Sequence, residues 1–264
     1  MSQFKKQYVV DQNMLRSDDL EKYLSEGNQI IITDHLMLEP FKAEPKNHSL
    51  MINRNLQILT THPNQTIVIS GGLGDLMRTE KSQGFPISID QLVSEENTLM
   101  FKNWLEDHNK LIDRGQNIAM ERINEDLSYI EDTYKPLIQK LSSGIKGEER
   151  RRYKDDKSSR VADIKDTALE LLKIEFNHDV NNFIEKKSIW LTFCIVHIWR
   201  ILDWAIKNGA DSSKSINGDQ FDIKYVVLSC FFDGLLTKEK WMMECRKDTL
   251  TIFNDLQIQN LIPR

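Results

Sequence analysis

The chain has 264 residues, of which 40% are hydrophobic, 8% aromatic and 28% charged. This composition is typical of globular proteins and excludes a disordered, fibrous or disulfide-stapled chain. At roughly 150 residues per domain, the length predicts one large domain or two small ones. The formal net charge of −5 argues against indiscriminate binding to nucleic acid, although a local basic groove is compatible with it.

The cysteines and the apolar stretches indicate the cellular compartment of the protein. Its three cysteines, Cys194, Cys230 and Cys245, form no C-x-x-C pair, which indicates a reducing, cytoplasmic setting. The N-terminal stretch lacks a long apolar region, so no signal peptide is expected. The most apolar stretch, Ile189–Ile206, carries polar residues in its second half, among them His197. We predict a helix buried in protein, with His197 in the core, and no membrane association.

The first ninety residues alternate between β-prone runs and helical patterns. The predicted strands cover residues 8–10, 29–33 and 66–70. Amphipathic spacing predicts helices over residues 15–24 and 53–59, and Asp34 is the expected N-cap of a further helix after the second strand. Strands that alternate with helices predict an α/β fold with a parallel sheet.

From Glu95 the pattern changes. Apolar residues recur at three- and four-residue spacing up to Leu141, which predicts long amphipathic helices. Residues 142–160 contain two glycines and four serines and predict a loop. The remaining expected elements are helices over 161–183 and 189–206, a loop over 207–218, a helix over 222–232, a strand over 234–237 and a final helix. The predicted organisation is a sheet domain in residues 1–94 and 189–264, interrupted by a helical insertion in residues 95–188.

Acidic residues follow the predicted strands. Asp11 ends the first strand, Glu39 lies in the helix after the second, Asp219 and Asp222 open the late helix, and Glu239 follows the last strand. An α/β sheet binds ligands at the carboxyl ends of its strands. Because converging carboxylates repel one another, such a cluster favours a divalent cation, Mg²⁺ or Mn²⁺. Each acid also has an ordinary alternative as a turn former, an N-cap or a surface residue.

These residues resemble the PIN-domain nuclease family. YVVDQN is similar to the opening of that family, with an aspartate at the first strand end and a small polar residue, Asn13, two positions later. IIITDHLMLE is similar to its second strand and the helix with its first glutamate. GDQFDIKYVVLSCFFDGLLTKEK resembles its aspartate-led helix, followed by a strand that ends in threonine and an acid two positions on. The resemblance covers about residues 1–90 and 190–250.

The resemblance also implies roles for particular residues. The implied metal ligands are Asp11, Glu39, Asp222 and Glu239. Asp219 is a second candidate for the third position. Asn13 and Thr237 would support the site through hydrogen bonds. The sequence departs from the commonest family pattern at Glu239, where aspartate is more usual.

The implied fold is a PIN-like parallel sheet flanked by helices, with a large all-helical insertion. The implied activity is metal-dependent phosphodiester hydrolysis. RNA is the favoured substrate because most of the family cuts RNA, and a toxin or antiphage role follows by analogy alone. The alternative is a PIN-like scaffold that binds nucleic acid or a protein partner without cutting. A haloacid-dehalogenase-like phosphatase ranks third, because the D-x-D motif it requires is absent after Asp11.

One stretch is locally basic. Residues 146–160 contain seven basic and four acidic residues, including the contiguous Arg150, Arg151 and Arg152. These arginines are candidates for contact with nucleic-acid phosphates near the cleft, and a solvated loop is the alternative. The helical insertion could clamp a substrate, form a homodimer face or dock a protein partner.

Overall fold

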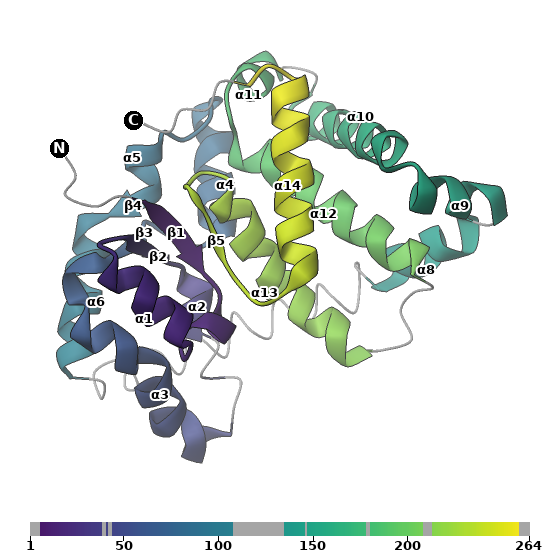
Figure 1. Ribbon diagram of the computed structural model, residues 1–264. Coiled ribbons are helices and arrows are strands. Elements are labelled where there is room, and N and C mark those ends of the chain that lie inside the picture. Colours follow the sequence, from purple (N-terminus) through teal and green to yellow (C-terminus); the bar gives the residue numbers. More distant parts are fainter. Residues whose placement is uncertain are drawn as a thin grey trace.

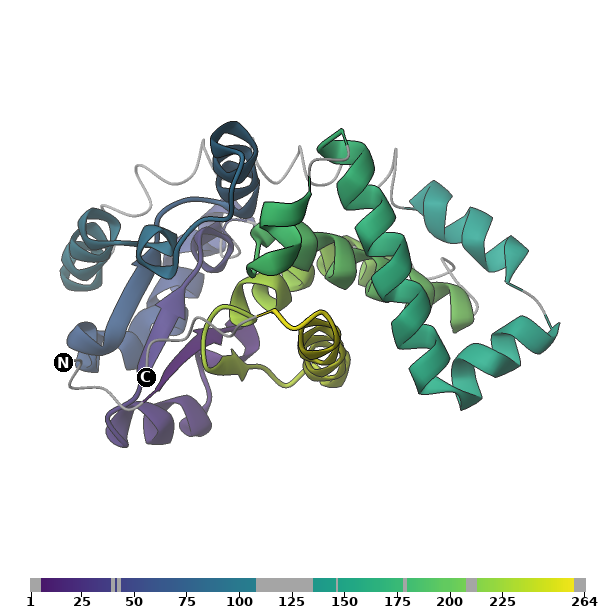
Figure 2. The same ribbon diagram turned by 90° about the horizontal axis from the view of Figure 1, so that it is seen from above.

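The computed structural model describes residues 6–38, 41, 44–107, 135–145, 147–177, 180–207 and 213–258. Figures 1 and 2 show two halves: the sheet with α1, α2, α3 and α6 fills one, and α8, α9 and α10 lie in the other. Helices α13 and α14 lie between these halves, beside strands from both ends of the chain (Figure 1).

Within the described residues, the sheet has five strands in the order β4-β3-β2-β1-β5. They are β1 (Gln7–Val10), β2 (Gln29–Ile32), β3 (Thr66–Ile69), β4 (Val93–Ser94) and β5 (Gly234–Leu236). All neighbouring pairs are parallel except β3 with β4. The predicted α/β class, its mostly parallel sheet and the return of the chain to the sheet near its C-terminus are confirmed. The short antiparallel β4 was not predicted.

Strand β2 explains why the pattern predicted the sheet. All four of its residues are buried, as both faces of a strand inside a parallel sheet are covered, and its β-branched side chains suit that environment. In register, Val9 of β1 pairs with Ile31 on one side and with Leu235 on the other. The first strand therefore lies inside the sheet, with strands from distant parts of the chain on its two sides.

Helices account for most of the rest of the described chain. Those of the first part are α1 (Asp18–Ser25), α2 (Asp34–Leu38), α3 (His48–Thr61), α4 (Leu73–Gln83), α5 (Ile89–Leu92) and α6 (Glu95–Glu106). Those of the later part are α8 (Lys135–Gly144), α9 (Gly147–Asp155), α10 (Lys157–Glu175), α11 (Asn181–Glu185), α12 (Ile189–Ile206), α13 (Ser213–Ser229) and α14 (Lys240–Asp255). Helices α1 and α3 confirm the helices expected over 15–24 and 53–59, whereas α4 was not predicted.

The loop predicted over residues 142–160 is wrong. The end of α8, the whole of α9 and the start of α10 occupy this stretch. Its arginines, lysines and glutamates are good helix formers, and Tyr153 supplies a buried anchor. Asp156 separates α9 from α10, where its Oδ1 accepts a hydrogen bond from the backbone N–H of Ser159 at 3.0 Å. The polar composition therefore belongs to an exposed helix, and Asp156 caps the start of the next one.

The predicted start of the late helix is also wrong. Helix α13 begins at Ser213, inside the loop expected over 207–218. Asp219 and Asp222 therefore lie within the helix, where neither opens it nor serves as its N-cap. The helical run expected over 161–183 is divided into α10 and α11, and Asn177 between them adopts a left-handed backbone conformation with φ of 50°.

Helix α12 forms the centre of the helical part and packs against α4, α8, α10, α13 and α14. Among the described residues, it is the one helix long and apolar enough to cross a membrane by length and composition, and 83% of it is buried inside the protein. His197 lies in the core as predicted, and burial lowers its pKa to about 4. The indole N–H of Trp199 donates to Asp248 of α14 at 2.9 Å, which joins the two helices.

A buried carboxylate attaches α12 to the sheet half. Glu80 of α4 is fully buried and accepts backbone hydrogen bonds from Ile87, Ile189 and Trp190 at 2.9 to 3.1 Å. Burial raises its pKa, and the three N–H groups oppose that rise. Since a helix leaves its first N–H groups without helical partners, Glu80 completes the N-terminus of α12 from a separate element.

Candidate functional site

The candidate site begins with Asp11 at the carboxyl end of β1. Its backbone N–H continues the pairing with β5 by donating to the carbonyl of Leu236 at 2.9 Å. Its side chain is 2% exposed. An acid buried at this edge of a parallel sheet occupies the position where α/β folds bind ligands.

Thr237 reaches Asp11 from the other end of the chain. It directly follows β5, and its hydroxyl donates to Asp11 Oδ2 at 2.8 Å. The amide of Asn13 donates to the same oxygen at 3.3 Å. The hydroxyl of Thr237 also accepts the backbone N–H of Glu239 at 3.0 Å. The supporting contacts that the resemblance implied for Asn13 and Thr237 are therefore present in the structure.

The electrostatics of Asp11 combine opposing effects. Burial raises its pKa most strongly. Hydrogen bonds from Thr237 and from the backbone at Asn13 and Gln12 oppose the rise, and the nearby charge of Glu239 adds to it. Glu239 is exposed and lies at the N-cap of α14. A cation between these two carboxylates would relieve their repulsion and favour the ionised form of Asp11.

For the remaining acids of the expected cluster, the structure describes the position of only some side chains. Asp222 is half-buried on α13, and α13 packs against β1 and β5. Asp219 lies on the same helix with its side chain outside the description, and Glu39 lies outside the described residues altogether. Among the side chains that the structure describes, no group of three or more His, Cys, Asp or Glu residues is placed to hold a metal ion. Among these acids, Glu239 is the one whose charge affects Asp11 in the structure.

Sequence reasoning missed a second polar group at the start of α2. Nζ of Lys224 on α13 contacts Nε2 of the buried His35, and Nδ1 of His35 lies 3.2 Å from Asp34. The ring of His35 packs against Phe221 with centroids 4.9 Å apart. Asp34 is not the expected cap: the hydroxyl of Thr33 accepts the N–H of Leu36 at 3.2 Å. The useful signal was the polar run directly after β2, at the same sheet edge as Asp11.

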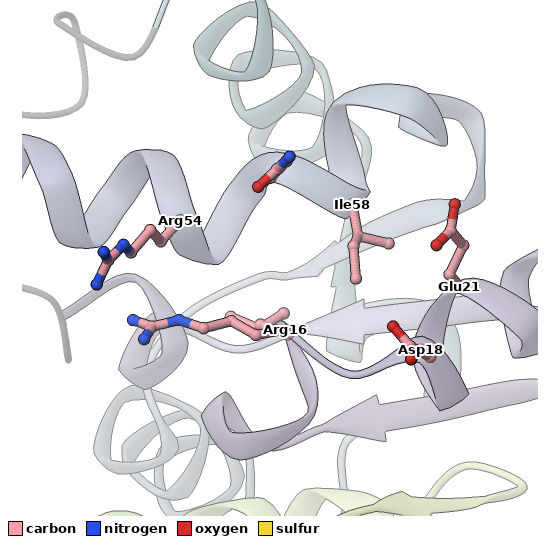
Figure 3. A pocket seen from close by; sticks show the side chains of 7 residues that line it. Arg16, Asp18, Glu21, Arg54 and Ile58 are labelled. Carbon is pink, nitrogen blue, oxygen red and sulfur yellow. The ribbon is translucent and has the colours of Figure 1, made fainter.

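A pocket of about 460 Å³ lies between α1 and α3. It is lined by Leu15, Arg16, Asp18, Glu21, Arg54, Gln57 and Ile58. Figure 3 shows the guanidinium groups of Arg16 and Arg54 at one end and the carboxylates of Asp18 and Glu21 at the other. The pocket is therefore strongly polarised. No sequence motif indicated it, because its two walls come from helices separated along the chain.

The contiguous arginines lie elsewhere. Arg150, Arg151 and Arg152 belong to α9, at the far end of the molecule from the sheet (Figure 1). Arg152 pairs with Asp163 at 2.6 Å, and Arg150 donates to the carbonyl of Ala205 at 3.4 Å. Two of the three therefore have structural contacts within the helical half.

Comparison of the chain with protein-family models, with curated proteins and with solved structures gives no match.

Proposed function

We propose that the protein is a metal-dependent endonuclease that hydrolyses phosphodiester bonds, with RNA as the substrate and Asp11 at its centre. The observation that carries the proposal is the arrangement of Asp11 at the carboxyl end of β1, held by Thr237 from the end of the neighbouring β5. Residues 226 positions apart are joined there by a direct hydrogen bond. Their parallel neighbouring strands agree with the PIN-like organisation that the residues resemble.

The donor chemistry suits a hard divalent cation. Asp11 and Glu239 offer carboxylate oxygens, which Mg²⁺ and Mn²⁺ prefer. The charge of Glu239 raises the pKa of Asp11, an unfavourable pairing that a bound cation would reverse. Asp222, Glu39 and Asp219 are proposed to complete the ligand set. When bound, Mg²⁺ or Mn²⁺ supplies activation of water and neutralisation of charge on the phosphodiester.

The residues around Asp11 have a positioning role in this proposal. The side chains of Thr237 and Asn13 both donate to Oδ2, so they fix the plane of the carboxylate. Thr237 also holds the backbone N–H of Glu239 and thereby places the second acid relative to the first. Preorganisation of this kind keeps ligands oriented before substrate arrives.

Replacement of Asp11 tests the activity. We expect wild-type protein to cleave a panel of single-stranded and structured RNAs in Mn²⁺ and Asp11→Asn to abolish cleavage. Asp90→Asn, an exposed acid on α5, is the matched control and should leave the rate unchanged. Isothermal calorimetry should show Mn²⁺ binding that Asp11→Asn weakens. Equal cleavage by wild type and Asp11→Asn would refute the assignment.

A scaffold that binds without cutting is the second candidate. It is favoured by the finding that no three metal-ligating side chains converge within the described part of the chain. It predicts RNA or partner binding with no cleavage and no carboxylate-dependent Mn²⁺ binding. The same calorimetric titration therefore separates the two functions.

A further inference from the structure

The pocket between α1 and α3 combines a fixed arginine with a second arginine. Nε and Nη2 of Arg16 both donate to Oδ1 of Asn55, at 2.9 and 2.7 Å. Asn55 is 1% exposed, so a buried side chain determines the direction of the Arg16 guanidinium. A preorganised guanidinium loses less conformational freedom when it binds an anion.

In the part of the chain that the structure describes, no carboxylate pairs with the arginine end of the pocket. Asn55 is uncharged, and neither Arg16 nor Arg54 forms an ion pair with any carboxylate among the described residues. Arg54 makes no hydrogen bond within the same part of the chain, and its side chain is exposed. Figure 3 shows the two guanidinium groups extending in the same direction. Two like charges held together in this way attract an anion, and guanidinium groups match phosphate with paired hydrogen bonds.

The arginine end faces the edge of the sheet that carries Asp11. Arg16 follows Asp11 by five residues through a short 3₁₀ helix, Gln12–Met14. At about 2 Å of rise per residue this helix spans about 6 Å, and five residues of chain hold the two Cα atoms within about 18 Å of each other. The strand arrows behind the pocket in Figure 3 also point toward the arginine end. A polymer bound at Asp11 can therefore reach both arginines.

We propose that Arg16 and Arg54 bind a backbone phosphate of the RNA strand whose scissile phosphate lies at Asp11. This inference rests on the proposed function, because that function places the scissile phosphate at Asp11. Asp18 and Glu21 at the opposite end repel the strand, so they direct it along the sheet edge and away from the length of the pocket. The site recognises the sugar-phosphate backbone and carries no base preference.

Binding to RNA in EDTA tests this site without cleavage. The probe is a short fluorescein-labelled single-stranded RNA, followed by fluorescence anisotropy over a range of salt concentrations. We expect Arg54→Gln and Arg16→Gln each to weaken binding by about tenfold at low salt. Each should also reduce the slope of log K against log salt by about 0.7, the value for one lost phosphate contact on a single strand. Arg54→Gln is the decisive variant, because Arg16→Gln also removes the contact with buried Asn55.

The matched control is Lys22→Gln, which removes an exposed charge from α1 outside the pocket lining. If Arg54→Gln and Lys22→Gln weaken binding equally, or if wild-type protein does not bind the RNA, the inference is overturned. Inorganic phosphate should compete with the RNA for the arginines. If it displaces RNA from the Arg54→Gln variant as effectively as from wild type, the inference is also overturned. Arginine-dependent binding without cleavage in Mn²⁺ would support the inference and refute the nuclease. Cleavage that needs Asp11 but neither arginine would refute only the inference.

Discussion

Glu80 is expected to stabilise the junction between the sheet and the helical part. The four N–H groups at the start of α12 all have partners: those of Ile189 and Trp190 donate to Glu80, and those of Leu191 and Thr192 donate to the hydroxyl and carbonyl of Ser188. A third N–H, from Ile87, also donates to Glu80. Substitution of Glu80 therefore leaves buried donors without acceptors.

The number of hydrogen-bond acceptors lost at Glu80 determines how far the free energy of unfolding falls. Glu80→Ala removes both oxygens and leaves three backbone N–H groups unpaired. At about 1 to 3 kcal/mol for each buried unsatisfied group, partial relaxation gives an expected loss of about 3 to 6 kcal/mol in the free energy of unfolding. Glu80→Gln keeps Oε1, which accepts from Ile87 and Ile189, and turns an amide group toward the N–H of Trp190. Its expected loss is about 1 to 3 kcal/mol.

Urea unfolding at neutral pH, followed by far-ultraviolet circular dichroism, measures these losses. Glu175→Gln is a suitable control, because Glu175 forms a partly exposed ion pair with Lys81 of the same helix α4. Exposed pairs contribute about 0 to 1 kcal/mol, so the control variant should have nearly the same free energy of unfolding as wild type. If Glu80→Ala costs no more than Glu175→Gln, the hydrogen-bond account of this junction is refuted.

Two further predictions concern the core. Burial lowers the folded-state pKa of His197 to about 4, so its contribution of about 3 kcal/mol is present above the unfolded value of 6.5 and is lost as pH falls toward 4. His197→Leu should therefore lose less stability over that range than wild type, as measured by urea unfolding. A Cβ added at Gly234 would lie 2.5 Å from the ring of Tyr8, so Gly234→Ala should cost about 1 to 3 kcal/mol. Gly74→Ala, where the nearest atom is 3.7 Å away at the end of Arg78, should be neutral or stabilising on helix propensity, and equal thermal melts for the two glycine variants would contradict the packing argument.

The sheet was predictable because each of its main strands carries its own signal. Residues of β2 and β3 are β-branched and mostly buried, so local sequence and tertiary environment agree. Strand β4 has only two residues, too few for a pattern. Its place at the edge depends on neighbours, including the hydroxyl of Thr98, which accepts the N–H of Val68 at 2.9 Å.

The helical part was less predictable because composition and structure disagree there. The polar stretch that contains α9 is indistinguishable by composition from a solvated loop, and only buried Tyr153 and the capping Asp156 separate the two. The start of α13 is similar, because its first residues are polar. In α9 helix propensity outweighed a pattern that predicted a loop. The first turns of α13 contain serine, asparagine and glycine, which are weak helix formers, so propensity does not explain that start.

The candidate site was predictable in part for a related reason. The contact between Asp11 and Thr237 follows from two strand ends that the parallel sheet brings to one edge. The pair of arginines between α1 and α3 depends instead on Asn55, whose burial and direction no local pattern encodes. Contacts set by strand order were therefore accessible from sequence, and contacts set by helix packing were not.

Asp11 and Glu80 are both buried acids, yet their surroundings predict opposite effects of neutralisation. Burial raises the pKa of both carboxyls, and at Asp11 the charge of the neighbouring Glu239 adds to the rise, whereas no acid is among the causes at Glu80. A raised pKa means that the ionised form lowers stability above that pKa at both sites. The asparagine oxygen of Asp11→Asn can still accept from Thr237, whereas Glu80→Gln turns its amide group toward the N–H of Trp190 and loses that hydrogen bond. In EDTA at neutral pH, Asp11→Asn should therefore match or exceed the wild-type urea midpoint, while Glu80→Gln falls below it. Loss of stability at Asp11 is expected of a structural acid, whereas a gain accompanied by loss of Mn²⁺ binding is expected of an acid retained for its ligand.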